Sequence, residues 1–250
     1  MRRKVMNFAK SSVKIPFFDS FKCRGASCPV SCCSGLRIAL PRGEEKDLPR
    51  EEWTTDEQGV CISMRPNGDC PFWTEDHRCQ RQRGDDQTAL PTICRFFPRI
   101  VNVYSDRTEY SLDTLCPEVC RLVATWEIGD VCVDGDAEFA DPQYRRRAEE
   151  MESYRTLELP GVAPSVADFL RRFGAYLLFV QYPAYAADPR AQGVFAPVRR
   201  FIVQTAERVR TFAALDEEFF AFICRAWRAF CGEYGFDADC EGNFGPRETQ

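Results

Sequence analysis

The sequence lacks a long apolar run, a hydrophobic leader and an excess of basic charge. Its longest apolar stretch, Phe173–Ala187, is broken by Gln181 and Pro183 and is shorter than the roughly 20 residues that a membrane-spanning helix needs. Residues Met1–Phe18 carry five basic side chains and no apolar segment of about seven residues or more, so we expect no secretory signal and a cytoplasmic protein. The formal net charge of -5 argues against general binding to nucleic acid, which needs a basic surface.

Composition is typical of a folded protein, with 44% hydrophobic and 28% charged residues in 250. A change of composition near residue 121 predicts two parts, 1–120 and 121–250. In the first part Gly, Pro and Cys interrupt the apolar runs, so only short elements are expected. These are strands at Leu36–Leu40 and Val60–Met64 and a hairpin of Arg99–Tyr104 with Thr108–Leu112.

The second part has the pattern of helices. Ser165 followed by Asp168 has the spacing of a capping box at the start of a buried helix. Apolar residues recur at helical spacing in the segments that follow. We expect helices over Pro142–Thr156, Phe169–Tyr182, Phe195–Leu215 and Asp216–Tyr234. The expected fold class is therefore α+β and mostly α, with a loop-dominated N-terminal module packed on a C-terminal helical bundle.

Cysteine is abundant, since the chain has 14 of them against one histidine, and ten lie between Cys23 and Cys120. Thiols stay reduced in the cytoplasm, so metal ligation explains such a cluster better than a disulfide framework does. Cys224 and Cys231 lie outside the cluster, seven residues apart on an expected helix. We expect these two to be small core residues.

Two kinds of metal centre fit the cysteine cluster. Zinc sites usually use cysteine pairs separated by about two to four residues, and the clearest such pairs are Cys28 with Cys32 and Cys116 with Cys120. Iron–sulfur clusters accept thiolates from irregular spacings and distant loops, so the pattern favours iron–sulfur, with zinc and unligated thiols as alternatives. Adjacent side chains seldom bind one ion together, so one of Cys32 and Cys33 is expected to serve another role.

Several short motifs follow one another between residues 21 and 120. They are the four-cysteine run Phe21–Arg37, then Cys70–Trp73, then Leu90–Arg99 with its sequence LPTICRFFPR, and finally Leu115–Glu118. In order and spacing these motifs resemble the flagellin lysine-N-methylase family, which is related to the bacterial zinc- or iron-chelating cysteine-cluster proteins. Leu36 is a departure, because the family usually has tryptophan at this place.

The resemblance implies an enzyme with a [4Fe-4S] cluster. This enzyme would move a methyl group from S-adenosylmethionine to lysine side chains of a protein substrate such as flagellin. It also implies which thiols ligate the metal. By position, the family's cysteines are Cys23, Cys28, Cys32, Cys33, Cys70, Cys79, Cys94 and Cys116.

No familiar motif for S-adenosylmethionine is present. The chain has neither a G-x-G-x-x-G loop nor the C-x3-C-x2-C triad of radical enzymes, because Gly35 stands where the third cysteine would fall. We hypothesise that an iron without a fourth thiolate binds the amino-carboxylate of the cofactor, with Arg95 or Arg99 beside the carboxylate.

The sequence names no catalytic base. The acidic pairs Glu75–Asp76 and Asp85–Asp86 offer charge that would attract a substrate lysine, although such pairs are more often solvated loops. His77 is a lone loop histidine, and most of these are neither bases nor ligands.

Two functions of other classes stay open: a non-enzymatic metal-binding or electron-transfer protein, and a zinc-stapled interaction module.

Overall fold

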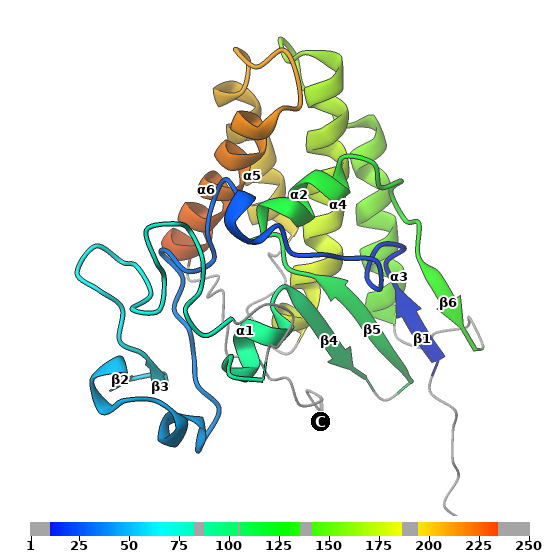
Figure 1. Ribbon diagram of the computed structural model, residues 1–250. Coiled ribbons are helices and arrows are strands. Elements are labelled where there is room, and N and C mark those ends of the chain that lie inside the picture. The colour runs from blue at the N-terminus through cyan, green and yellow to red at the C-terminus, as the bar shows by residue number, and fades with distance from the viewer. Residues whose placement is uncertain (1–10, 83–87, 105, 136–141, 187–194, 235–250) are drawn as a thin grey trace, which may run out of the picture.

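The computed structural model describes residues 11–82, 88–104, 106–135, 142–186 and 195–234. Within these ranges the chain forms a four-stranded sheet, a two-stranded hairpin and six α-helices. Figure 1 shows the sheet at the base of the molecule, helices rising above and behind it, and the small hairpin projecting to one side. The mixed α and β class expected from the sequence is confirmed.

The larger sheet has the strand order β4-β5-β1-β6. β4 (Arg99–Val103) and β5 (Arg107–Leu112) pair antiparallel, which confirms the predicted hairpin. β1 (Ser11–Lys14) lies parallel to β5 and antiparallel to β6 (Cys132–Asp134). The first described strand is therefore an internal strand of the sheet, and its Val13 is completely buried.

One face of β5 buries charge instead of apolar side chains. Glu109 accepts hydrogen bonds from Nε of Arg107 at 2.6 Å and from both terminal nitrogens of Arg147 at 2.8 Å, and all three side chains are almost fully buried. Tyr144 lies under both guanidinium groups, 4.8 Å from Arg107 and 4.9 Å from Arg147. Burial opposes ionisation of Glu109, but the two cations outweigh it and lower the pKa of the carboxyl.

Three of the six described helices begin with proline. Proline suits the first turn of a helix, because the N–H groups of that turn have no partner inside the helix. The predicted helices are present, with two corrections at their ends. Ser165 lies inside α4 and caps nothing, because Pro164 already belongs to the helix, and α5 ends at Arg208, before Leu215. The helices are α1 (Thr92–Phe96), α2 (Pro117–Val123), α3 (Pro142–Glu152), α4 (Pro164–Ala186), α5 (Phe195–Arg208) and α6 (Glu217–Tyr234).

Most apolar side chains belong to one hydrophobic cluster, which we call the main core. It joins the sheet with α2, α4, α5 and α6, and Phe169, Phe173 and Tyr176 of α4 are completely buried within it. The boundary predicted between residues 120 and 121 lies inside α2, whose side chains belong to this core. Of the helices in the described ranges, none is both long enough and apolar enough to cross a membrane.

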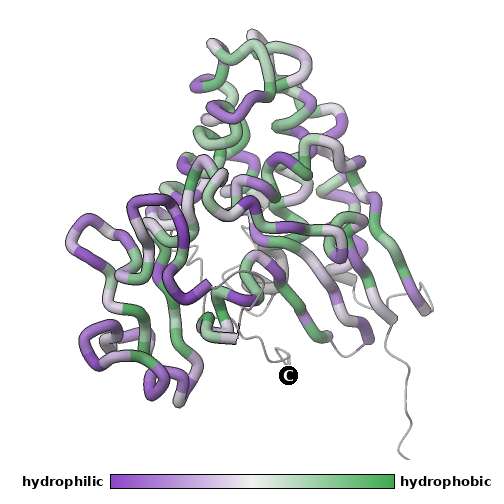
Figure 2. Tube along the Cα trace, in the orientation of Figure 1, coloured by the Kyte–Doolittle hydropathy of each residue, from purple (hydrophilic) through white to green (hydrophobic). Residues whose placement is uncertain are grey.

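A second cluster, the small core, lies under the hairpin of β2 (Trp53–Asp56) and β3 (Gly59–Ile62). The strand predicted at Leu36–Leu40 is wrong, since this segment forms a single bridge from Ala39 to Cys61 of β3. The apolar alternation that suggested a strand is real, because its alternate side chains are buried, but the backbone beside β3 is irregular. Figure 2 shows hydrophilic segments at the turns of this region and hydrophobic ones along the helices. The small core consists of Ile38, Leu40, Leu48, Ile62, Cys70, Phe72 and Ile93.

Candidate functional site

The cysteine loop, residues Cys23–Ser34, runs between the main core and the small core. Its backbone turns at Gly25 and again near Gly35, where positive φ angles of 57° and 73° favour glycine. Thirteen of the cysteines lie among the described residues. Seven of them form two neighbourhoods that the loop connects.

The first neighbourhood contains Cys33, Cys70 and Cys79. The amide of Cys70 donates to the carbonyl of Cys33 at 2.7 Å, and Cys79 forms a β-bridge with Trp73. Burial raises the pKa of the Cys70 thiol to about 12, and the thiols of Cys33 and Cys79 add to the shift. Three of the eight predicted ligands therefore lie close to one another.

The adjacent pair Cys32 and Cys33 links the neighbourhoods. A hydrogen bond from Cys32 lowers the pKa of Cys33 to about 7, and the hydroxyl of Ser31 acts in the same direction. The pKa of Cys32 is raised by its contact with Cys33 and by burial, with smaller contributions from Cys94 and Cys23. The Cys33 thiol is therefore more acidic than an ordinary cysteine.

The second neighbourhood joins Cys28 and Cys116 with Cys120 of α2 and Cys224 of α6. Burial raises the pKa of Cys116, and the nearby thiols of Cys28 and Cys224 raise it further. Cys120 and Cys224 contact each other, and each thiol has a carbonyl acceptor, at 3.3 Å from Thr114 for Cys120 and at 3.1 Å from Leu115 for Cys224. Cys224 is buried, as expected for a core residue, but its neighbours are thiols.

These thiols have the donor chemistry that a metal centre needs. Among the described residues, however, no three His, Cys, Asp or Glu side chains are arranged so that they could hold a metal ion. The contacts are those of protonated thiols that donate to backbone carbonyls, as Cys28 does to Val30 at 3.2 Å. The donor set is present, and the sulfur atoms have the arrangement of free thiols.

The two arginines proposed beside a cofactor lie near the cysteines in different settings. Arg95 is exposed on α1 and donates to the hydroxyl of Thr92 at 3.1 Å. Arg99 is half-buried, with its guanidinium 5.6 Å from the ring of Phe21 and 5.9 Å from that of Phe18. Neither lines the pocket described next.

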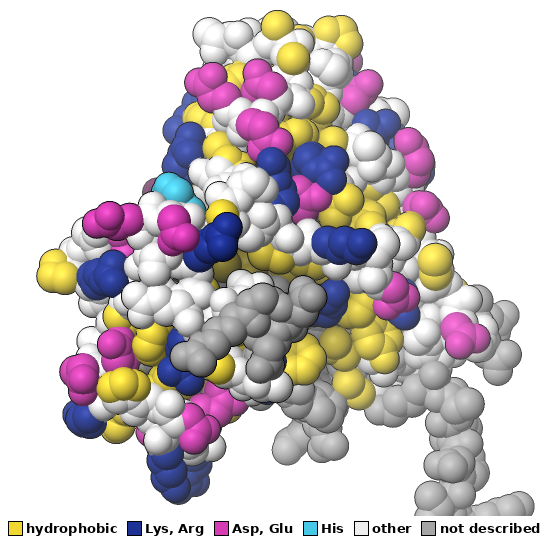
Figure 3. Space-filling model, viewed as in Figure 1, with side chains coloured by type: hydrophobic (Ala, Val, Ile, Leu, Met, Phe, Trp, Pro, Cys, Tyr) yellow, Lys and Arg dark blue, Asp and Glu magenta, His cyan; other side chains and the backbone are white. Residues whose placement is uncertain are grey.

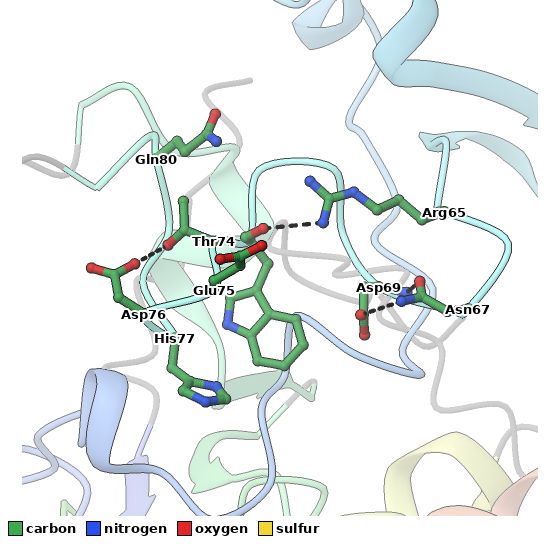
Figure 4. A pocket seen from close by; sticks show the side chains of 9 residues that line it. Arg65, Asn67, Asp69, Thr74, Glu75, Asp76, His77 and Gln80 are labelled. Atoms are coloured by element: carbon green, nitrogen blue, oxygen red, sulfur yellow. Dashed lines mark hydrogen bonds between the residues drawn. The ribbon is translucent and has the colours of Figure 1, made fainter.

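An open pocket of about 750 Å³ adjoins the first thiol neighbourhood. Its wall includes Trp73, which forms the bridge to Cys79, and the turn that follows. His77 has a φ angle of 60° in this turn, and its ring lies 5.3 Å from the indole of Trp73. Figure 4 shows the polar side chains around the opening. The pocket is lined by Arg65, Asn67, Asp69, Trp73, Thr74, Glu75, Asp76, His77 and Gln80.

The carboxylates of the pocket differ in their partners. Asp69 accepts a hydrogen bond from Asn67 at 2.7 Å, and Asp76 accepts one from Thr74, which lowers the pKa of Asp76. Glu75 has no hydrogen-bond partner among the described residues and is exposed. On the face shown in Figure 3, acidic and basic side chains are interspersed. The second predicted acidic pair, Asp85–Asp86, lies outside the described residues.

Sequence reasoning did not single out Arg228 of α6. Its guanidinium donates to the carbonyls of Ser31, Ser34 and Leu115, at 3.1, 3.2 and 2.8 Å. No motif marks this residue among the many arginines, because its acceptors are backbone atoms brought together by the fold.

Comparison with known proteins gives three relatives. The flagellar biosynthetic protein FliU of Salmonella muenchen is 31% identical over 123 residues, covering 43% of this chain and 73% of FliU. Lysine-N-methylases of Salmonella typhimurium and Salmonella choleraesuis are each 30% identical over 123 residues. The aligned part is again 43% of this chain, and it spans 31% of the length of each methylase.

Other comparisons give no match. No family profile matches the chain, and no solved structure matches it. The alignment with FliU nevertheless covers most of that protein, and the two lysine-N-methylases align over an equal length. The chain belongs to the flagellin lysine-N-methylase family.

Proposed function

We propose that the protein is a cytoplasmic lysine N-methyltransferase that transfers methyl groups from S-adenosylmethionine to a protein substrate, with flagellin as the first candidate. Membership of a family that contains proteins named lysine-N-methylase is the observation that carries this proposal. The relatives with that name are much longer than the aligned part, so the activity of the whole enzyme is part of the proposal.

The substrate lysine is proposed to enter the pocket beside Trp73. An alkylammonium group is attracted by carboxylates and by an indole face, and the pocket offers Glu75, Asp69 and Asp76 together with Trp73. The amine must lose a proton before its nitrogen attacks the methyl carbon and the sulfonium C–S bond breaks. The pocket also adjoins Cys79, so the proposed lysine site lies next to the proposed metal ligands.

The cysteine region is proposed to bind a [4Fe-4S] cluster, with zinc as the alternative. The donor set supports this proposal, because seven of the eight family cysteines lie in the two thiol neighbourhoods or on the loop between them, and the eighth, Cys94 of α1, lies near Cys32. A cluster would supply an iron able to bind the amino-carboxylate of S-adenosylmethionine. Arg95 and Arg99 are the proposed partners of that carboxylate.

A methylation assay tests the proposed function. The chain is purified without oxygen, analysed for iron, zinc and acid-labile sulfide, and incubated with flagellin and isotope-labelled S-adenosylmethionine. Mass spectrometry of the digested flagellin is expected to show labelled methyl-lysine. Metal-loaded protein that gives no methyl-lysine would overturn the proposal and leave a non-enzymatic metal-binding protein as the better account.

The pocket has a matched control in the same region. Trp73 and Trp53 are both partly buried and both pack against the small core, but only Trp73 lines the pocket. Trp73→Ala is expected to slow methylation about fivefold to tenfold through loss of the cation–π contact, whereas Trp53→Ala leaves the rate unchanged. Equal losses in the two variants would show that the effect comes from the small core.

A further inference from the structure

Helix α6 of the C-terminal part is bonded to the cysteine loop. Arg228 donates through Nη1 to the carbonyls of Ser31 and Ser34, at 3.1 and 3.2 Å. The same guanidinium donates through Nη2 and Nε to the carbonyl of Leu115, at 2.8 and 3.2 Å. One side chain therefore joins three backbone carbonyls from two separate segments.

Both segments carry proposed metal ligands. Ser31 and Ser34 flank the pair Cys32–Cys33, and Leu115 directly precedes Cys116, which stands at the N-cap position of α2. The bond from Cys224 to the carbonyl of Leu115 adds a second contact from α6 to the same corner. Arg228 thus connects the two cysteine segments at the place where the thiol neighbourhoods meet.

Arginine has the shape that this connection needs. Its planar guanidinium directs several N–H groups in fixed directions, whereas the lysine ammonium is a compact charge on a flexible stem. Arg228 is half-buried, so its hydrogen bonds to carbonyls are partly shielded from water. A lysine at this position would keep the charge and lose the simultaneous bonds to both segments.

A second contact holds the other end of the loop. At the start of α6 the two oxygens of Glu217 accept hydrogen bonds from Nη1 of Arg24, both at 2.7 Å. Glu217 is more than half exposed, so this contact is weaker than that of Arg228. The two residues of α6 are about three helical turns apart, roughly 16 Å, and lie along the length of the loop.

We propose that Arg228 is a positioning residue of the metal centre: it fixes the Cys32–Cys33 turn relative to Cys116, so that thiols from both segments are held for one centre. This inference rests on the proposed metal-binding role of the cysteines and does not depend on methyl transfer. It gives the C-terminal helix a role in a centre whose proposed ligands all lie before residue 121.

Thiol reactivity in the metal-free chain tests the role of Arg228. The variants are Arg228→Lys, Arg228→Gln and the control Arg225→Ala, an exposed residue on the same helix. The rate of alkylation of each cysteine is followed by mass spectrometry under native conditions. Arg228→Lys and Arg228→Gln are expected to speed alkylation at Cys32, Cys33 and Cys116 at least about tenfold, because the segments separate.

Cys61 of β3 and Cys132 of β6 serve as internal references, since neither belongs to the thiol neighbourhoods or to a segment held by Arg228. Their rates are expected to stay unchanged, as are all rates in Arg225→Ala. Reconstitution with iron and sulfide should then load less metal into the Arg228→Lys chain than into the Arg225→Ala chain. Unchanged alkylation in the lysine variant, or an equal rise at every cysteine, would overturn the positioning role. These readouts need no methyl acceptor, so they remain informative if the methylation assay fails.

Discussion

The main core and the small core differ in how much apolar surface each removes from water. The main core contains 41 buried residues among those described, whereas the small core contains seven. Burial of a large apolar side chain stabilises a fold by roughly 1.5 to 3 kcal/mol. In the main core this stabilisation is large enough to offset the conformational entropy that the chain loses on folding. In the small core, burial of apolar side chains offsets much less of this entropy loss.

The comparison explains where the cysteines lie. Cys70 belongs to the small core itself, and Cys33, Cys79 and Cys94 pack against it. Small loop-rich regions commonly depend on a metal or on covalent links for stability. We therefore expect the helix and sheet body to be stable alone, and the region around the pocket to be the part that a metal centre would stabilise.

The largest predicted effect lies in the main core. Glu109→Gln leaves two buried arginines without their shared counter-charge, which is expected to cost about 3 to 5 kcal/mol of unfolding free energy. Urea unfolding followed by circular dichroism measures the loss. A cost below about 1 kcal/mol would show that the network is hydrated and that the main core depends on apolar packing alone.

A pH dependence is predicted from Asp113, at the junction between β5 and α2. Burial raises the pKa of this carboxyl to about 6, from an ordinary value of 3.8, and a hydrogen bond from the Leu115 amide and the charge of Arg228 only partly oppose burial. The folded state therefore holds the proton more tightly than the unfolded state. Stability is fully present below about pH 4 and declines as the pH rises to about 6, by on the order of 3 kcal/mol.

Asp113→Asn tests this dependence, because the amide cannot ionise. The variant is expected to lose the decline between pH 4 and pH 6 and to be at least as stable as the parent chain at pH 7. Thermal unfolding at several pH values makes the comparison. An identical pH profile in the two chains would contradict the assignment to Asp113.

Metal removal is expected to affect the stability of the two cores differently. In the metal-loaded chain, chelation is expected to speed proteolysis between residues 37 and 80 about tenfold, equivalent to about 1.4 kcal/mol of lost local stability. The melting of the main core is expected to change little. Cys70→Ser should reproduce the effect without a chelator, whereas Cys231→Ser, which changes a main-core thiol, should not. Loss of both cores together would show that they unfold as one unit.

The smallest effect is predicted for an exposed ion pair of the main body. Glu207 accepts a hydrogen bond from Arg210 at 2.7 Å on the solvent side, and both side chains are about half exposed. Glu207→Gln is expected to cost only about 0.2 to 0.5 kcal/mol, since water screens an exposed ion pair at the end of α5. Urea unfolding of this variant measures the loss of unfolding free energy, which is then compared with the loss in Glu109→Gln.

Local patterns in the sequence predicted a good part of the fold. The β4–β5 hairpin and the helices α3 to α6 follow from turn residues and apolar spacing. β1 could not be predicted, because four residues of ordinary composition become a strand only by pairing with β5, far along the chain. The charged residues Arg107 and Glu109 of β5 would be expected on a solvent-facing side of the sheet. They belong instead to a buried network that includes Arg147 of α3.

The candidate site was predictable in composition and unpredictable in arrangement. The cysteine motifs indicate the family, and the acidic pair Glu75–Asp76 lines the pocket together with Trp73. The contact between Cys120 and Cys224 joins residues more than a hundred positions apart. No local spacing carries that information, because it arises when α2 and α6 pack together.

The internal position of β1 has a consequence for biosynthesis. Ser11 pairs with Arg107, so β1 leaves the ribosome long before its partner strand has been made. At about 5 to 20 residues per second, β1 waits roughly 5 to 20 s for that partner. Val13, which ends completely buried, stays exposed to water and to chaperones during this time. The sheet therefore cannot assemble until β5 has been made, although β1 is the earliest of its described strands.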